Sequence, residues 1–236
     1  MGFFRGPKIV TDGLVLALDA ANHKSYPGSG TTAYDLSGNL NSGSLVNGTG
    51  FSISNQGAWD FDGTNDYIRV NSISNPVNVS DFSVEAWIKL DVIPTGNPRI
   101  VSLGGDASNY FNLATYGGNS PGTYDTFWFE VKKGGNYYGG FHNTGRKYVI
   151  DTWYHLLGTF DNSTNTAKLY INGVSVTGGG VGGGAPNVFS TLLIATSTTS
   201  PGEVINGLIP VIRYYTKILT ASEIQQNFNA TKSRFI

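Results

Sequence analysis

The 236-residue sequence contains no cysteine, which excludes disulfides, thiol catalysis and cysteine-based zinc sites. Charged residues make up only 13% of the chain, and 15 basic against 16 acidic side chains leave a net charge of −1. This balance offers no electrostatic basis for binding nucleic acid. No apolar run reaches the roughly 20 residues of a membrane helix, and the opening residues lack a signal-peptide pattern. We therefore expect a soluble protein without nucleic-acid binding or membrane insertion.

Glycine and aromatic residues are abundant instead, and short strand patterns dominate the chain. Residues 82–90 place five apolar side chains on one face, with Ser83, Glu85, Trp87 and Lys89 on the other, the period of two expected of a half-buried strand. Residues 126–132 repeat this alternation, and 153–160 and 167–176 follow as two neighbouring strands. Asn172-Gly173 predicts a type I′ hairpin within the last segment, because both central residues of that turn need positive φ. Together these patterns predict an all-β, two-sheet antiparallel sandwich.

A single helix is predicted, at the C-terminus. Thr220 is a suitable N-cap, Glu223 completes a capping box, and Leu219 with Ile224 can form a hydrophobic staple. The glycine-rich residues 177–186 are interpreted as a long loop within one domain.

Several segments in fixed order carry a family resemblance. They are YDLSGNLNSGSLVNG (34–48), WDFDGTNDYIRV (59–70), DFSVEAWIKL (81–90), WYHLLGTFDNSTNTAKLYINGV (153–174) and GLIPVIRYYTKILTASEIQQNF (207–228). In this order they resemble the concanavalin A-like, laminin-G-like jelly-roll domains. The resemblance implies one jelly-roll domain over residues 13–236, preceded by residues 1–12 as an N-terminal arm or a first strand.

The two ends of the chain, residues 3–32 and 219–235, are similar to stand-alone lectin-like virion proteins of tailed bacteriophages. This resemblance implies a non-enzymatic structural protein, assembled in the host bacterial cytoplasm and displayed on the virion surface. It would be a capsid decoration protein or a tail fibre-type protein, a homo-oligomer in contact with other virion proteins. The alternative is a carbohydrate-binding adhesin that recognises host surface glycans.

A glycoside hydrolase is the least favoured alternative. Related jelly-roll hydrolases carry alternating acidic residues of the form E-x-D-x-E on one strand, because hydrolysis needs a pair of carboxylates. The four glutamates of this chain form no such pattern: Glu85, Glu130, Glu203 and Glu223. We therefore predict no catalytic residues.

Calcium is the only candidate cofactor, with Asp62, Asn65 and Asp66 as its oxygen ligands. Aspartate and asparagine beside Gly63 are also what a tight turn requires, and we favour the turn. The stretch 59–70 is accordingly predicted to form a hairpin corner, with two aromatic residues inside and two aspartates outside. These residues are Trp59 and Phe61 against Asp60 and Asp62.

A saccharide site needs exposed aromatic rings and nearby amides. The candidates are Tyr110, Tyr124, Trp128 and Tyr137, with Asn136 and Asn143. Trp128 alternates in phase with Glu130 and Lys132, which predicts that it is exposed. The alternative is that these rings pack inside the sandwich.

The N-terminal arm contains a candidate attachment element, Phe3, Phe4 and Arg5. Two adjacent phenylalanines are costly to expose unless a neighbouring subunit covers them. The alternative is that this segment folds back onto its own sheet as a first strand.

Overall fold

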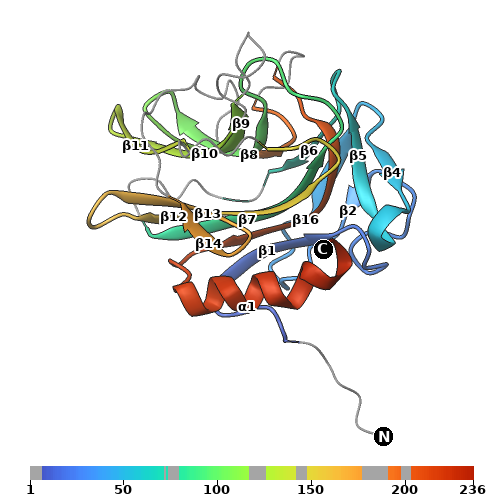
Figure 1. The fold of residues 1–236 in the computed structure, drawn as a ribbon, viewed down its shortest axis with the longest axis horizontal. Coiled ribbons are helices and arrows are strands. Elements are labelled where there is room, and N and C mark those ends of the chain that lie inside the picture. Colours follow the sequence, from blue (N-terminus) through green and yellow to red (C-terminus); the bar gives the residue numbers. More distant parts are fainter. Residues whose placement is uncertain are drawn as a thin grey trace, which may run out of the picture.

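The computed structural model describes residues 7–71, 73, 80–116, 126–141, 148–176, 191–197 and 203–236. Two antiparallel sheets pack face to face, and one α-helix lies on the outside of the first sheet (Figure 1). This arrangement confirms the predicted two-sheet sandwich with one short C-terminal helix.

The first sheet follows the order β14-β13-β12-β7-β16-β5-β4, and β1 also pairs with β16. Its strands are β14 (Val174–Val176), β13 (Thr166–Ile171), β12 (Trp153–Asp161), β7 (Phe82–Leu90), β16 (Asn206–Tyr215), β5 (Ala58–Asp62), β4 (Gly50–Ser52) and β1 (Leu14–Asp19). The predicted Asn172-Gly173 hairpin is confirmed, because both residues have positive φ and join the paired strands β13 and β14.

The second sheet follows the order β11-β10-β9-β8-β15-β6-β3-β2. Its strands are β11 (Asn136–Phe141), β10 (Thr126–Lys133), β9 (Asn109–Tyr116), β8 (Arg99–Asp106), β15 (Thr191–Ile194), β6 (Tyr67–Val70), β3 (Gly43–Val46) and β2 (Thr32–Ala33). Between the sheets lies one apolar core, to which alternate residues of each strand contribute. On β7, Phe82, Val84 and Ile88 belong to this core, as the alternation predicts.

The turn after Trp59 and Phe61 is not a hairpin corner, and that prediction was wrong. Both aromatic residues are buried in the core as expected. However, β5 belongs to the first sheet and β6 to the second, so residues 63–66 carry the chain across the sandwich. A turn between two strands of one sheet and a turn that crosses to the other sheet need the same turn residues and flank the same strand alternation. The sequence therefore does not show which sheet the next strand joins.

The C-terminal helix α1 (Ala221–Thr231) begins at the predicted capping box of Thr220 and Glu223. It is followed by the short 3₁₀ helix η2 (Lys232–Arg234), and a second one, η1 (Ser54–Gln56), precedes β5. Ile224 packs with Leu157 and Leu219 on the outer side of the first sheet. Within the described chain, no helix is long and apolar enough to cross a membrane.

The helix buries the side of β7 that faces away from the core. The sequence predicts a half-buried strand, with this side facing solvent. Ser83, Glu85 and Trp87 have at most 1% of their surface exposed. Phe228 stacks on the Trp87 indole with ring centroids 5.9 Å apart. For Ser83 and Glu85 the expected exposure was wrong, because alternation within one strand cannot show that a distant helix covers its polar side.

A polar network fixes the helix to the sheet. The Glu85 carboxylate pairs with Arg213, accepts a hydrogen bond from Asn227 Nδ2 at 3.0 Å, and lies 3.4 Å from His155 Nε2. Burial tends to raise the pKa of Glu85, but Arg213 and His155 outweigh burial and lower it from 4.5 to about 2. Glu85 is therefore a buried, ionised anchor for α1.

The N-terminal segment is held by the same network. The backbone N–H of Val10 donates to Asn227 Oδ1 at 2.8 Å, and the Tyr215 hydroxyl donates to the Val10 carbonyl at 3.3 Å. Residues 7–12 form no strand, since the first strand begins at Leu14. The candidate attachment residues Phe3, Phe4 and Arg5 lie outside the described residues.

Candidate functional site

Three of the predicted saccharide-binding residues lie together on the outer face of the second sheet. Lys132 of β10 is opposite both Tyr110 of β9 and Tyr137 of β11 in the strand register. Trp128, four residues before Lys132, points to the same side of β10. The structure therefore brings Tyr110, Trp128 and Tyr137 onto one surface, while Tyr124 and Asn143 lie outside the described residues.

Polar side chains that the sequence reasoning missed lie between these rings. Asn112 Nδ2 donates to Glu130 Oε1 at 3.2 Å. The Arg99 guanidinium lies 5.4 Å from the centroid of the Trp128 ring and forms an ion pair with Glu203 at 2.9 Å. The signal that could have found Asn112 is its spacing, because it lies two residues from Tyr110 on the same side of β9.

The predicted exposure of Trp128 was wrong. Trp128, Tyr110, Asn112 and Arg99 each have 0% of their surface exposed. Burial lowers the pKa of Arg99, against the opposing effect of Glu203 and Glu130, and burial is also the main cause of the raised pKa of Tyr110. Strand parity identifies the side to which a residue points but not what lies over that side, so it cannot predict exposure.

Ser102 Oγ and Asn112 Oδ1 on this face are buried and make no hydrogen bond within the part of the chain that the structure describes. Ser102 is opposite Asn112 in the register of β8 and β9. Buried polar groups are normally paired, so these two atoms are exceptions, as are the ring nitrogens of His155 on the outer face of the first sheet.

Tyr137 lies at the accessible end of this face, beside the turn between β10 and β11, whereas the adjacent Asn136 points to the other side of β11. Tyr137 is half-buried and Asn136 is exposed. The Lys132 ammonium lies 4.9 Å from the centroid of the Tyr137 ring, and the Tyr110 hydroxyl donates to the Tyr137 hydroxyl at 3.4 Å. Tyr137 is therefore held in place while part of its ring stays accessible.

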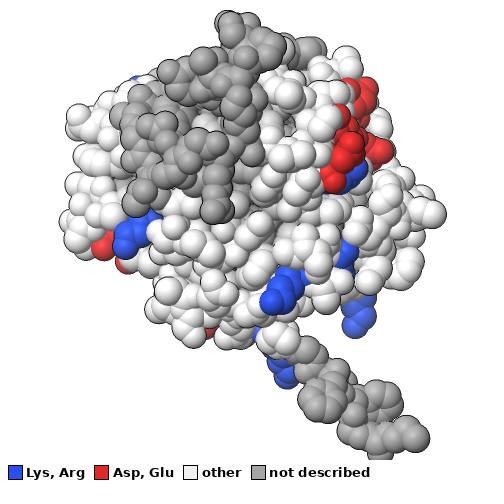
Figure 2. All heavy atoms as spheres, in the orientation of Figure 1, with Lys and Arg blue, Asp and Glu red and all other residues white. Residues whose placement is uncertain are grey.

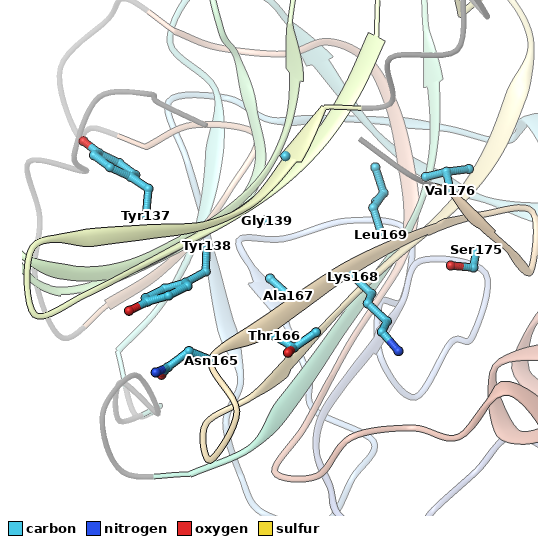
Figure 3. Close-up of a pocket in the computed structure, with 11 residues that line it drawn as sticks. Tyr137, Tyr138, Gly139, Asn165, Thr166, Ala167, Lys168, Leu169, Ser175 and Val176 are labelled. Carbon is cyan, nitrogen blue, oxygen red and sulfur yellow. The ribbon is translucent and has the colours of Figure 1, made fainter. Parts of the chain in front are cut away.

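A groove opens next to Tyr137, at the edge of the sandwich between β11 and the β13–β14 hairpin (Figure 3). Its volume is about 570 Å³. Tyr138 points across the groove toward β13, whereas Tyr137 points away from it (Figure 3). Tyr138, Ala167 and Val176 are partly buried against the core, so the floor of the groove is apolar.

Asn165 supplies an oriented polar group at one end of the groove. Lys133 Nζ donates to Asn165 Oδ1 at 2.7 Å and to the Asn162 carbonyl at 2.8 Å. Because an ammonium group only donates, it fixes the oxygen of the Asn165 amide toward Lys133. The amide Nδ2 is then left as a donor, and no carboxylate is among the described residues that line the groove.

The candidate calcium ligands occupy a turn. Asp62 Oδ1 accepts a hydrogen bond from Thr64 N at 2.7 Å, and Gly63 has a φ of 75°. Burial and the charge of Asp62 raise the pKa of the Asp66 carboxyl. Among the described residues, no three histidine or acidic side chains are arranged to hold a metal ion. The turn is confirmed, and these contacts give no support for calcium.

Solved structures share this fold. Domain 4 of AbnA, a GH43 extracellular arabinanase from Geobacillus stearothermophilus in complex with arabinotriose, has a TM-score of 0.66 at 19% identity, with 92% of this chain and 98% of that chain covered. The receptor-binding domain of botulinum neurotoxin type G has a TM-score of 0.64 at 14% identity, over 92% of this chain. The binding domain of Paraclostridial Mosquitocidal Protein 1 has a TM-score of 0.67 at 17% identity, over 93% of this chain.

The match spans 51% and 52% of the two toxin domains, about half of their length. At these identities the likenesses show the fold alone. No curated protein matches the chain. A family model described as the concanavalin A-like lectin/glucanases superfamily matches residues 62–225, which is more than half of the sequence. The chain belongs to the concanavalin A-like lectin/glucanases superfamily.

Proposed function

We propose that the protein is a non-enzymatic, lectin-like domain that binds a carbohydrate in the groove between β11 and the β13–β14 hairpin. The observation that carries this proposal is the pairing of the Tyr138 ring with the oriented Asn165 amide across an open groove. The outer face of the second sheet lies beside the groove and holds Tyr137 at the rim of the groove.

The chemistry of the groove suits a sugar. One face of a sugar ring is covered by C–H groups that pack on an aromatic ring, and its hydroxyls need hydrogen-bond donors and acceptors. Tyr138 offers the ring and Asn165 Nδ2 the donor, while the apolar floor excludes water. The volume of about 570 Å³ lies within the range of about 300–1,000 Å³ that is typical of small-molecule sites.

The solved structures with this fold give independent support for ligand binding as the function of this domain. The arabinanase domain was determined in complex with arabinotriose, and the two toxin segments are described as binding domains. These are properties of those proteins. They make arabinotriose a reasonable first probe for this chain.

Among the described residues that line the groove there is no carboxylate, which supports a binding role without hydrolysis. Glycoside hydrolysis needs two carboxylates on either side of the scissile bond. Two carboxylates, those of Glu130 and Glu203, do occur together on the outer face of the second sheet, where both raise the pKa of Arg99. For this reason the test of function includes a hydrolysis assay.

We propose that this domain is displayed on a bacteriophage virion, as a homo-oligomer in contact with other capsid or tail proteins. The support is the resemblance of the two chain ends to such proteins. Many copies on one particle would multiply a weak affinity for glycans on the host surface. Quantitative mass spectrometry of purified particles tests this placement, and absence of the chain from them would refute it.

Binding is tested by titration calorimetry with arabinotriose and by an array of bacterial surface glycans. We expect Tyr138→Leu, which removes the aromatic ring, and Asn165→Gly, which removes the amide donor, each to weaken binding by about tenfold. Glycine retains the positive φ of 54° at position 165. Matched controls are Tyr34→Leu at an exposed tyrosine and Asn47→Gly at an asparagine with a φ of 60°.

Equal affinities of the groove variants and the controls would remove the groove from the proposal. Failure to bind any glycan would refute carbohydrate recognition. Release of reducing ends from a bound glycan, lost in Glu130→Gln, would replace the binding role with an enzymatic one.

A further inference from the structure

Four aliphatic side chains are exposed on two loops at one end of the sandwich. Val92 and Ile93 follow β7, with 46% and 51% of their surface exposed. Val149 and Ile150 precede β12, with 59% and 39% exposed. Single exposed aliphatic residues are common, but adjacent pairs on two loops need an explanation.

The two loops form one surface because they are joined directly. The backbone N–H of Asp151 donates to the Leu90 carbonyl at 2.8 Å. Lys89 Nζ lies 3.2 Å from Asp91 Oδ1 and 3.0 Å from Asp151 Oδ1, so its ammonium links the loops a second time. We call Val92, Ile93, Val149 and Ile150 with this support the apolar loop surface.

Acidic residues border the apolar loop surface. Asp91 and Asp151 belong to the loops themselves. Asp62 lies close by, since Asn206 donates through Nδ2 to the Asp62 carbonyl and accepts a hydrogen bond from Asp91 N at its own carbonyl. Asp60 also lies close to Asp91, since burial and then the charge of Asp91 raise the pKa of the Asp60 carboxyl. Lys89 thus pairs with two aspartates and two more lie on the same side of the loops, and acidic atoms gather beside a basic group on one side of the molecule (Figure 2).

We infer that the apolar loop surface docks a partner protein whose contact surface has an apolar centre and a rim of lysine or arginine. The apolar side chains would supply the buried centre and the aspartates the complementary rim. A second copy of this chain in a symmetric contact would place aspartates against aspartates, and an anionic membrane would be repelled in the same way. The charge therefore favours a basic protein.

This surface is separate from the proposed glycan groove. Val149 and Ile150 precede the first residue of β12, Trp153, whereas Asn165 follows the last, Asp161. The two sites thus lie at opposite ends of that strand. One end could bind a glycan while the other is fixed to a partner, and the inference does not depend on carbohydrate binding.

The test uses site-specific photocrosslinking in the particles or cells that contain the full chain. A benzophenone amino acid replaces Val92, and the control replaces Val174, which is 62% exposed on the edge strand β14. We expect the Val92 probe to crosslink one other protein, within a peptide rich in lysine and arginine. The yield should fall by about fivefold in about 0.5 M salt, because the rim is electrostatic.

Two further variants separate the apolar centre from the rim. Ile93→Ser removes an exposed apolar contact, and Asp91→Asn with Asp151→Asn removes two of the four acidic side chains of the rim. Each should lower the crosslink yield by about fivefold. Asp12→Asn, at a carboxylate that is 81% exposed and pairs with Lys217, is the control and should leave the yield unchanged.

Four results would overturn the inference: a crosslink between two copies of this chain, a crosslink to lipid, no crosslink, or a yield insensitive to salt and to these variants. An equal yield from the Val174 probe would show non-specific capture and would also count against it.

Discussion

The outer faces of the two sheets carry similar side chains in different surroundings. Each has a buried tryptophan and a buried arginine in an ion pair, Trp87 with Arg213 on the first sheet and Trp128 with Arg99 on the second. Helix α1 covers the first face, whereas no described helix or strand covers the second (Figure 1).

The difference lies in how two buried serines are paired. On the first face, Ser83 Oγ donates to the Lys217 carbonyl and accepts from Leu219 N, so both of its roles are used by the chain that leads into α1. On the second face, Ser102 Oγ makes no hydrogen bond among the described residues. Pairing is not complete on the first face either, because both ring nitrogens of the buried His155 lack a hydrogen-bond partner among the described residues, so the contrast between the faces rests on the two serines.

The largest expected effect is on the first face. Glu85→Gln removes the charge that compensates the buried Arg213, and we expect it to lower the free energy of unfolding by about 3–5 kcal/mol. Urea denaturation measures the loss. The surface control Asp12→Asn should change it by about 0.5 kcal/mol or less. Equal effects of the two variants would contradict the assignment of Glu85 as an anchor.

Acid should lower the stability that the ionised Glu85 contributes to the first face. The folded pKa of Glu85 is about 2, below its ordinary value of 4.5, so its stabilisation is complete above pH 4.5 and is lost as the pH falls toward 2. The full loss is about 3 kcal/mol. Denaturation of the parent and Glu85→Gln across pH 5 to 2 should show a steeper decline for the parent, and parallel curves would disprove the linkage.

Removal of Asn227 should release the N-terminal segment from the first face. Its amide binds Val10 N, the Tyr215 hydroxyl and Glu85, so we expect Asn227→Ala to cost about 2–3 kcal/mol. Hydrogen exchange at Val10 should accelerate more than exchange in the core strands. Unchanged protection of Val10 would show that the segment is held by other contacts.

The smallest effect is expected on the second face, and it is the sharpest test of the comparison. Ser83→Ala should cost about 1–2 kcal/mol, because the backbone groups of Lys217 and Leu219 lose their partner. Ser102→Ala should change the free energy of unfolding by about 0.5 kcal/mol or less. Similar losses from both serines would mean that Ser102 is satisfied and that the two faces do not differ.

The candidate site was only partly predictable from the sequence. The sequence offered Tyr110, Trp128 and Tyr137 as candidates, and only the register of β9, β10 and β11 shows that they share one face. The groove depends on Tyr138, on β11 of the second sheet, and Asn165, in the turn that precedes β13 of the first sheet. No local pattern links them, because their proximity follows from the packing of the two sheets.

The sequence by itself determined the local structure of this protein. The strand alternation of 82–90, the Asn172-Gly173 turn and the Thr220–Glu223 capping box each depend on residues within a few positions of one another. Only the tertiary structure decided which sheet each strand joins, which face the helix covers and where the sandwich stays open. These features depend on contacts between distant segments, and the period of one strand is the same whether its polar side meets water or another part of the chain.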